Sequence, residues 1–192
     1  MGKINVLPEK VASKIAAGEV IERPSSVLKE LIENSIDAES NKIFVEIEKS
    51  GRKLIKVSDN GTGIEEDDIE NVFLRYATSK IKDENDLEKI ISLGFRGEAL
   101  HSISIVSDVV LRSKTDKEEI GTEIHIRGGK KLEKKKVGMN RGTIVEVREL
   151  FFNTPVRRKF LKSDTTEFRQ ILNVFLPYTL CFHNIEFHLK HN

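Results

Sequence analysis

Residues 26–38 read SVLKELIENSIDA, and this stretch predicts an amphipathic helix around which the rest of the chain is organised. Its apolar residues recur at the spacing of one helix face: Val27, Leu28, Leu31, Ile32 and Ile36. At about 100° per residue, Glu30, Asn34 and Asp37 fall within roughly 60° of one another at the border of that face. A border stripe can face a cleft, and its oxygen atoms suit Mg²⁺ and water. The alternative is an acidic, solvent-exposed edge of an ordinary helix.

Length and composition favour one soluble domain. With 192 residues the chain can form one large domain or at most two small ones, and we expect one. The 32 basic and 31 acidic residues give a net charge of +1, which argues neither for nor against nucleic-acid binding. No apolar run approaches the roughly 18 residues of a membrane span, and no signal peptide is visible, so we expect an intracellular protein without a membrane partner. The single Cys181 agrees, because it permits no internal disulfide.

The residues on either side of the opening helix predict a short helix before it and two strands after it. Residues 9–17 place apolar side chains on one face, and Gly18 stands where a C-terminal cap would end that helix. Pro24, or a serine after it, supplies the N-terminal signal of the opening helix. Residues 42–48 alternate strictly between apolar and polar, and residues 54–58 follow across a Ser-Gly turn. This pattern predicts a strand, a turn and a second strand.

Two glycine-containing loops come next. The second strand runs into DNGTG at residues 59–63, after which residues 69–76 have the spacing of another helix. Two glycines around one small residue allow positive φ and let the backbone approach a flat ligand, although an isolated pattern of this kind is more often an ordinary turn. It is neither a Walker A loop nor a dinucleotide fingerprint. Residues 77–88 look like a long loop, and GFRG at residues 94–97 opens onto a further helix, where it could close over an anion or act as a plain linker.

The remainder of the chain reads mainly as strands. They are expected at residues 106–112, 120–127, 131–137 and 143–149, with a last strand around residues 185–189. Asp164 and Glu167 are a plausible capping pair for the one long helix in this half. The pattern predicts an α+β fold, a two-layer sandwich of a mostly antiparallel sheet with helices on one face and a cleft between the layers. Because the chain stops on an apolar strand, we expect residues 1–192 to be a single domain and a fragment of a longer protein.

Taken together, the motifs are far more specific than any one of them. Four of them, in order, resemble the nucleotide motifs of the gyrase, Hsp90, histidine-kinase and MutL ATPase superfamily: Glu30-x-x-x-Asn34, Asp59-x-Gly61-x-Gly63, Gly94-x-x-Gly97 and Gly142-Thr143. Over nearly the whole chain, the sequence motifs are similar to those of the MutL family of DNA mismatch repair proteins. They are KIAAGEV at 14–20, ERP at 22–24, ATSK at 77–80, GFRGEAL at 94–100, NTP at 153–155 and RRKF at 157–160. The departures are small, such as Lys14 where a glutamine is common.

The resemblance implies a Bergerat-type ATP-binding fold with Mg²⁺ as cofactor. In this family Glu30 would polarise the attacking water and Asn34 would hold Mg²⁺, while Asp59 would accept from the adenine amino group. Gly61 and Gly63 would let the chain pass the ring, and Thr143 would support it through its hydroxyl group. The lid over the phosphates would be formed by two groups of residues: Thr78, Ser79 and Lys80, and Gly94, Phe95, Arg96 and Gly97.

The resemblance also implies partners beyond the nucleotide. ATP would close the lid and pair two copies of the full-length protein as a homodimer, with the N-terminal arm at residues 1–18 crossing to the partner. The protein would relay mismatch detection to downstream repair proteins in the cytoplasm, associated with the nucleoid if the source is prokaryotic. It would bind DNA weakly and without sequence preference. The basic residues at 157–162 could contact phosphates, or could form a solvated helix edge.

Other function classes stay open. A histidine kinase or a chaperone could share the nucleotide motifs, but the first needs a phospho-acceptor histidine domain and the second different loops, and neither is visible. A non-hydrolysing ATP-sensing module is a further alternative. Glu30 argues against it, because a pure sensor needs no water-activating carboxylate. Cys181 and the nearby histidines are a weak candidate for a metal site.

Overall fold

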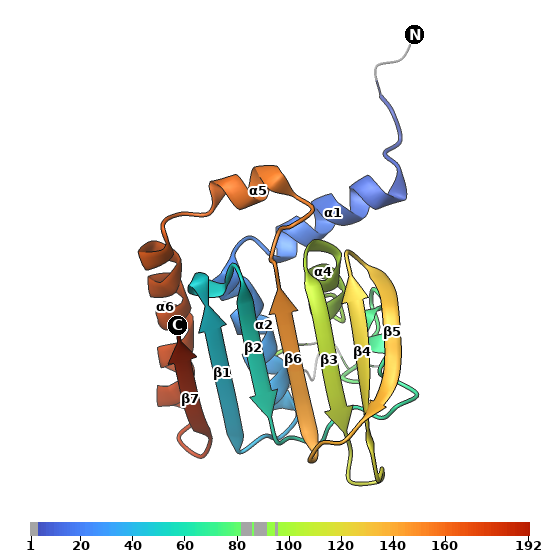
Figure 1. Ribbon diagram of the computed structural model, residues 1–192, viewed down its shortest axis with the longest axis vertical. Helices are drawn as coiled ribbons and strands as arrows, with labels where there is room; N and C mark the ends of the chain where they lie inside the picture. Colours follow the sequence, from blue (N-terminus) through green and yellow to red (C-terminus); the bar gives the residue numbers. More distant parts are fainter. Residues whose placement is uncertain (1–3, 82–85, 87–91, 95) are drawn as a thin grey trace.

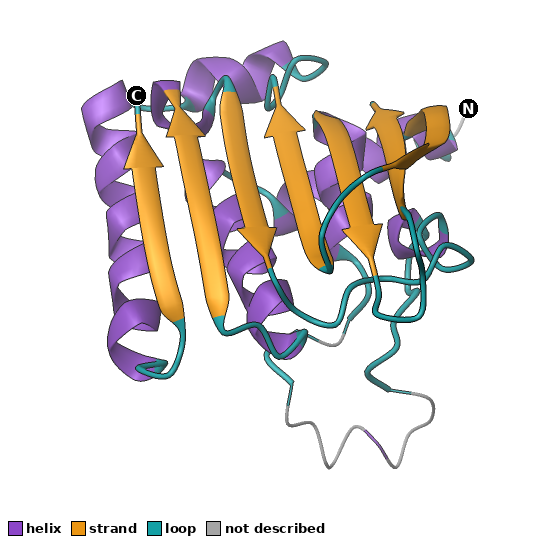
Figure 2. Ribbon diagram, turned by 60° about the horizontal axis from the view of Figure 1, so that its bottom comes forward, coloured by secondary structure: helices purple, strands orange, loops and turns teal. Residues whose placement is uncertain are grey.

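The computed structural model describes residues 4–81, 86, 92–94 and 96–192, and these form one sheet with helices on one side (Figures 1 and 2). The strands are β1 Lys42–Glu48, β2 Leu54–Asp59, β3 Asp108–Lys114, β4 Gly121–Arg127, β5 Lys130–Val137, β6 Gly142–Arg148 and β7 Glu186–His191. The helices are α1 Glu9–Val20, α2 Pro24–Asp37, α4 Ala99–Val106, α5 Pro155–Phe160 and α6 Asp164–Cys181, with short 3₁₀ turns η1 Lys49–Gly51 and η2 Asn71–Phe73. Within these described ranges, no helix is long and apolar enough to cross a membrane.

The seven strands lie in the order β5-β4-β3-β6-β2-β1-β7. All neighbouring pairs are antiparallel except β1 and β7, which run parallel. The chain reaches β7 only after crossing behind the sheet in α6, and this long return makes the parallel pairing possible. The predicted α+β fold, with a mostly antiparallel sheet, is therefore confirmed.

The core lies between the sheet and the helices packed on it. On β1, Ile43, Val45 and Ile47 are completely buried and point to the helical layer, as strict alternation requires. From α2, Leu28 and Ile32 are also completely buried. Helix α2 packs against α6, and α1 packs against α4, so two helix pairs form the layer on this side of the sheet (Figure 2).

Gly18 does not end the first helix, so that expectation is wrong. Helix α1 continues to Val20, and Ile21 follows as the C-terminal cap with its N–H donating to the Ala17 carbonyl at 2.9 Å. A Cβ atom at Gly18 would lie 1.4–1.6 Å from the guanidinium atoms of Arg157. The glycine thus makes room for an arginine from a distant segment, a constraint that local sequence does not show.

Two further local predictions are corrected. Residues 69–76 form only the short turn η2, because their backbone groups bond outside the segment: the Phe73 carbonyl pairs with His101 Nδ1 at 2.8 Å, and Tyr76 N–H donates to the Gly97 carbonyl at 2.9 Å. At α6 the cap is Ser163, whose hydroxyl accepts from the Thr166 N–H, rather than Asp164. The spacing of Leu87, Ile90 and Ile91 also predicts a helical turn, and these residues lie outside the described part of the chain.

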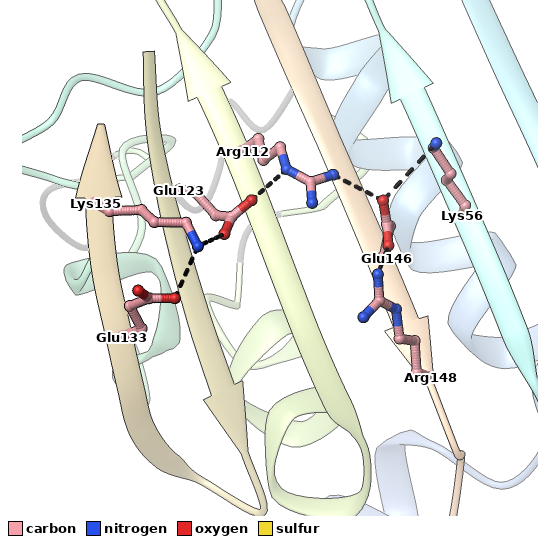
Figure 3. Close-up of polar contacts among 7 residues, drawn as sticks. All are labelled: Lys56, Arg112, Glu123, Glu133, Lys135, Glu146 and Arg148. Carbon is pink, nitrogen blue, oxygen red and sulfur yellow. Dashed lines mark hydrogen bonds and ion pairs between the residues drawn. The ribbon is translucent and has the colours of Figure 1, made fainter. Parts of the chain in front are cut away.

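The face of the sheet without helices carries a chain of ion pairs across neighbouring strands (Figure 3). Arg112 on β3 lies at its centre and pairs with Glu123 on β4 and with Glu146 on β6, the latter at 2.8 Å. Both carboxylates are nearly buried. Burial by itself would raise the pKa of Glu146 and of Glu123, but hydrogen bonds from Arg112 hold both pKa values below their usual range.

Replacing Arg112 with methionine should lower the free energy of unfolding by about 1–2 kcal/mol at neutral pH, because two nearly buried carboxylates lose a charged donor. A carboxyl group with a lowered folded-state pKa contributes stability above its unfolded pKa of about 4.3, and this contribution is lost as the pH falls through the folded pKa. Urea unfolding at pH 7 and pH 3.5 should therefore show the difference from the wild type shrinking in acid.

Lys117→Met is the matched control, because Lys117 pairs with Glu65 on the surface, where both side chains are at least half exposed. It should change stability little at either pH. A loss in Arg112→Met that stays the same at both pH values would show that packing of the arginine stem, and not its charge, carries the effect.

Candidate functional site

A cleft of about 1200 Å³ opens between three parts of the structure. They are α2, the strands β2, β3 and β6, and the segments at residues 62–80, 93–94 and 96–98. Its apolar floor is formed by β-strand side chains that include Val57, Leu111 and Val145. Polar groups stand around this floor. A largely apolar recess with a few converging polar groups is the usual form of a small-molecule site.

The polar stripe of α2 faces this cleft. Glu30, Asn34 and Asp37 all line it, because the apolar face of the helix is buried against the sheet and turns the stripe to the border between the two layers. The alternative of a plain solvated edge is excluded by this placement. The predicted residues outside α2 that line the same cleft are Asp59, Gly63, Thr78, Ser79, Lys80, Gly94, Arg96, Gly97 and Thr143. Phe95 lies outside the described residues.

Glu30 is held among other charged groups at the cleft wall. Burial raises its pKa, and the attraction of Lys29, whose Nζ lies 3.8 Å from Glu30 Oε1, opposes that shift. Lys29 is itself fixed by Glu33 at 2.8 Å, and Glu33 accepts a hydrogen bond from the Tyr178 hydroxyl at 2.7 Å. A carboxylate with a raised pKa is a better proton acceptor, so Glu30 is suited to act as a general base.

Asp59 is a largely enclosed acidic group of the site, held by donors from three elements. Its Oδ1 accepts from the N–H groups of Gly61 at 3.0 Å and Thr143 at 3.2 Å, and its Oδ2 accepts from the Ser35 hydroxyl at 2.8 Å. Burial raises the pKa of Asp59, while these donors favour its charged form. The carboxylate is therefore fixed in direction from several elements and keeps acceptor capacity toward the cleft.

The glycines around Asp59 allow close backbone contacts. Gly63 has φ +77°, and a Cβ atom there would lie 2.2 Å from the Lys114 carbonyl oxygen. Gly142, at φ +124°, would place a Cβ atom 2.0 Å from the carbonyl oxygen of Asp59. Gly61 lies beside Ala38 and is not among the cleft-lining residues, so its contribution is the N–H that holds Asp59.

Ser113 on β3 joins the segments next to Asp59, and the sequence analysis missed it. Its hydroxyl donates to the Gly142 carbonyl at 3.0 Å, contacts Thr143 Oγ1 at 2.9 Å and accepts from Ile64 N–H at 2.8 Å. In the sequence it stands between Arg112 and Lys114, just past the strand expected at residues 106–112. Nothing local distinguishes it, because all its partners come from other segments.

Asp37 is the second residue that sequence reasoning undervalued. Its Oδ1 accepts from Leu93 N–H at 2.9 Å, and its Oδ2 accepts from Gly94 N–H at 3.1 Å and from Lys80 Nζ at 2.5 Å. Lys80 Nζ also donates to Asn34 Oδ1 at 3.1 Å. Asp37 therefore links α2 to both segments predicted to cover the phosphates, whereas the sequence placed it on the stripe of α2 without a role of its own.

The donor set beside these segments fits a magnesium ion. Asn34 offers an amide oxygen and Glu30 a carboxylate on the same edge of α2, and both are hard oxygen ligands of the kind Mg²⁺ prefers. Over the part of the chain that the structure describes, no group of three or more His, Cys, Asp and Glu side chains could hold a metal by themselves. A metal at Asn34 would thus need oxygens from a bound ligand and from water.

Comparison with known proteins places this fold and cleft in a family. The family described as "Histidine kinase-, DNA gyrase B-, and HSP90-like ATPase" matches residues 21–147. The chain is 53% identical over its full length to DNA mismatch repair protein MutL of Clostridium botulinum, of which it covers 29%. It is 54% identical over 186 residues, 97% of the chain, to MutL of Aquifex aeolicus, of which it covers 44%. The chain thus spans less than half the length of these relatives.

Solved structures agree. The Aquifex aeolicus MutL ATPase domain complexed with ADP superposes with a TM-score of 0.73 at 45% identity, covering 90% of this chain and 61% of that one. The N-terminal domain of a DNA repair protein superposes with a TM-score of 0.79 at 31% identity, covering 94% of this chain and 52% of that one. The resemblance to MutL read from the motifs is confirmed. The chain belongs to the histidine kinase-, DNA gyrase B- and HSP90-like ATPase family.

Proposed function

We propose that this chain is the ATP-binding and ATP-hydrolysing region of a MutL-type DNA mismatch repair protein. The observation that carries the proposal is that Glu30, Asn34 and Asp59 all line one cleft. The similarity to a MutL ATPase domain complexed with ADP supports a nucleotide as the ligand. A partly buried carboxylate with a raised pKa at Glu30 favours hydrolysis over a purely ATP-sensing module.

The roles of the residues follow from what each can donate or accept. Asp59 accepts from the exocyclic amine of adenine, a group that guanine lacks at that position, and Thr143 supports the ring through its hydroxyl. Glu30 takes a proton from the attacking water. Mg²⁺, held by Asn34 and by phosphate oxygens, would offset the charge on the phosphates. Thr78, Ser79, Lys80, Gly94, Arg96 and Gly97 border the cleft where the phosphates would lie.

The longer protein would use this chemistry as a switch in the cytoplasm. ATP would draw the segments at 78–80 and 94–97 over the phosphates and favour pairing of two copies, with the arm at residues 1–18 contributing to the contact. Pairing would then signal mismatch detection to downstream repair proteins. The basic residues of α5 would contribute weak contacts to DNA phosphates.

Glu30→Gln and Asp59→Asn should separate turnover from binding. Glu30→Gln removes the proton acceptor and should lower turnover by about 10²–10⁴-fold while ATP affinity stays near the wild-type value. Asp59→Asn keeps one oxygen for the N–H groups of Gly61 and Thr143 but replaces the other with an NH2 group, which cannot accept from an adenine amine, and should weaken ATP binding about tenfold or more. Calorimetry with ATP and a phosphate-release assay measure the two quantities. An equal loss of ATP affinity in both variants would contradict the assignment.

The pH dependence of turnover tests Glu30 independently. Because burial raises the pKa of Glu30, the base is lost by protonation at a higher pH than for an exposed glutamate. The wild-type rate at saturating ATP should fall as the pH drops through that pKa. Burial also raises the pKa of Asp59, so ATP affinity is measured at each pH to separate loss of binding from loss of the base. A rate that stays flat down to the usual glutamate pKa of about 4.3 would argue against Glu30 as the base.

Gly97→Ala should weaken nucleotide binding without touching adenine contacts. Gly97 has φ +61°, and a Cβ atom there would lie 2.5 Å from the Ala77 carbonyl oxygen, so alanine must displace the contact between Gly97 and Tyr76. We expect about a tenfold loss of ATP affinity in calorimetry. Gly138→Ala is the matched control, because no heavy atom lies within 4 Å of its Cβ position. Equal affinities in the two variants would show that this contact does not shape the site.

Turnover and pairing should be weak in this chain and stronger in a longer one. The chain covers 61% of the solved MutL ATPase domain and 29% of a full-length relative, and the uncovered parts of such relatives would supply groups that act on the phosphates and at the interface. Loss of one cation from a phosphoryl-transfer site can cost orders of magnitude in rate. Nucleotide affinity, turnover and molecular mass by light scattering should be compared for both lengths. If the 192-residue chain hydrolyses ATP as fast as the longer one, all groups required for hydrolysis lie within residues 1–192, and the prediction is wrong.

A further inference from the structure

Lys80 already places a cation at the oxygen assigned to the metal. Its Nζ lies 3.1 Å from Asn34 Oδ1 and 2.5 Å from Asp37 Oδ2, so the ammonium bridges two residues of the α2 stripe. The Asp37 side chain is 8% exposed and the Lys80 side chain 23% exposed, so solvent screens this contact less than a surface ion pair. The ammonium group satisfies both oxygens in the absence of any other cation.

A magnesium ion and this ammonium group cannot share that oxygen. Mg²⁺ binds oxygen at about 2.0–2.1 Å, requires octahedral geometry and keeps several waters, all of which need space around Asn34 Oδ1. An ammonium at hydrogen-bond distance from the same atom fills part of that space and repels the ion. Binding of Mg²⁺ to Asn34 therefore requires the Lys80 ammonium group to move away.

We propose that Lys80 is a positioning residue that occupies the metal position beside Asn34 until magnesium and nucleotide arrive together, and then leaves it for the phosphates. The inference rests on the proposed function, because it takes Asn34 as the metal ligand and a polyphosphate as the other partner. The four-carbon stem of lysine lets the ammonium move without backbone change. Incoming phosphate oxygens supply the anionic partner that replaces Asn34.

Asp37 keeps hydrogen-bond donors of its own when Lys80 moves from Asn34 to the phosphates. When Lys80 leaves, Asp37 keeps the N–H groups of Leu93 and Gly94 as donors, so its nearly buried carboxylate is not stranded. Lys80 is held in turn to its own segment by the hydrogen bond from its N–H to Thr78 Oγ1 at 3.1 Å. Metal arrival thus releases one of the two segments from α2 while the other stays tied.

The test is the magnesium dependence of nucleotide binding, measured by calorimetry with a non-hydrolysable ATP analogue over a magnesium series. In Lys80→Met no resident ammonium competes, so the magnesium concentration for half-maximal gain in affinity should fall about fivefold or more. Lys29→Met is the matched control: it removes the same charge from the same cleft, but Lys29 pairs with Glu30 and Glu33 rather than Asn34. Its shift should stay under about twofold.

The outcomes separate the explanations. A larger shift in Lys80→Met than in Lys29→Met supports competition at Asn34. Equal shifts would mean that Lys80 acts only through the general field of the cleft, and an unchanged or higher magnesium requirement would mean that it does not occupy the metal position; either result overturns the proposal. Lys80→Gln replaces Lys80→Met if thermal unfolding shows the latter to be misfolded. A wild-type chain that binds no nucleotide at any magnesium concentration refutes the proposed function first, and this inference with it.

Discussion

The burial of the apolar face of α2 against the sheet is the constraint on which the site depends. Val27, Leu28 and Ile32 are completely buried, and each such side chain contributes about 1.5–3 kcal/mol by leaving water. Turning the helix by one residue, about 100°, would expose this face and push Glu30 toward the core. The position of Glu30, Asn34 and Asp37 at the border of the layers is therefore fixed by hydrophobic packing rather than by their own contacts.

Around Asp59 the constraint is that an enclosed carboxylate must accept hydrogen bonds from its surroundings. A carboxylate enclosed at the end of β2 is costly unless donors surround it, and here they come from Ser35 of α2, Gly61 of the following loop and Thr143 of β6. These donors lock α2 and two neighbouring strands to one another at the point where the cleft begins. The same atoms that make the carboxylate tolerable also fix the direction in which it can accept a further hydrogen bond.

What the sequence could predict was local periodicity. The alternation at 42–48 and the helical spacing at 26–38 gave the strands, the helix and its cleft-facing stripe, because burial imposes those periods directly. Gly18, Ser113 and Asp37 were misjudged for a common reason, which is that their partners lie far away along the chain. The contact of an arginine with Gly18, or of two backbone N–H groups with Asp37, does not change the pattern of residues next to them in the sequence.

The two walls of the cleft differ in how they are held, and this difference suits a site that must change on binding. One wall is α2 with β2 and β6, fixed by core packing and strand pairing. The other wall, made by described residues of the segments 62–80, 93–94 and 96–98, has little regular structure and is tied by individual contacts, such as Tyr76 to Gly97, Gly94 to Asp37, and Lys131 of β5 to Glu70. Breaking one such contact costs far less than unpacking a helix. A ligand that offers replacement partners can therefore rearrange the second wall while Glu30, Asn34 and Asp59 on the first wall stay in place.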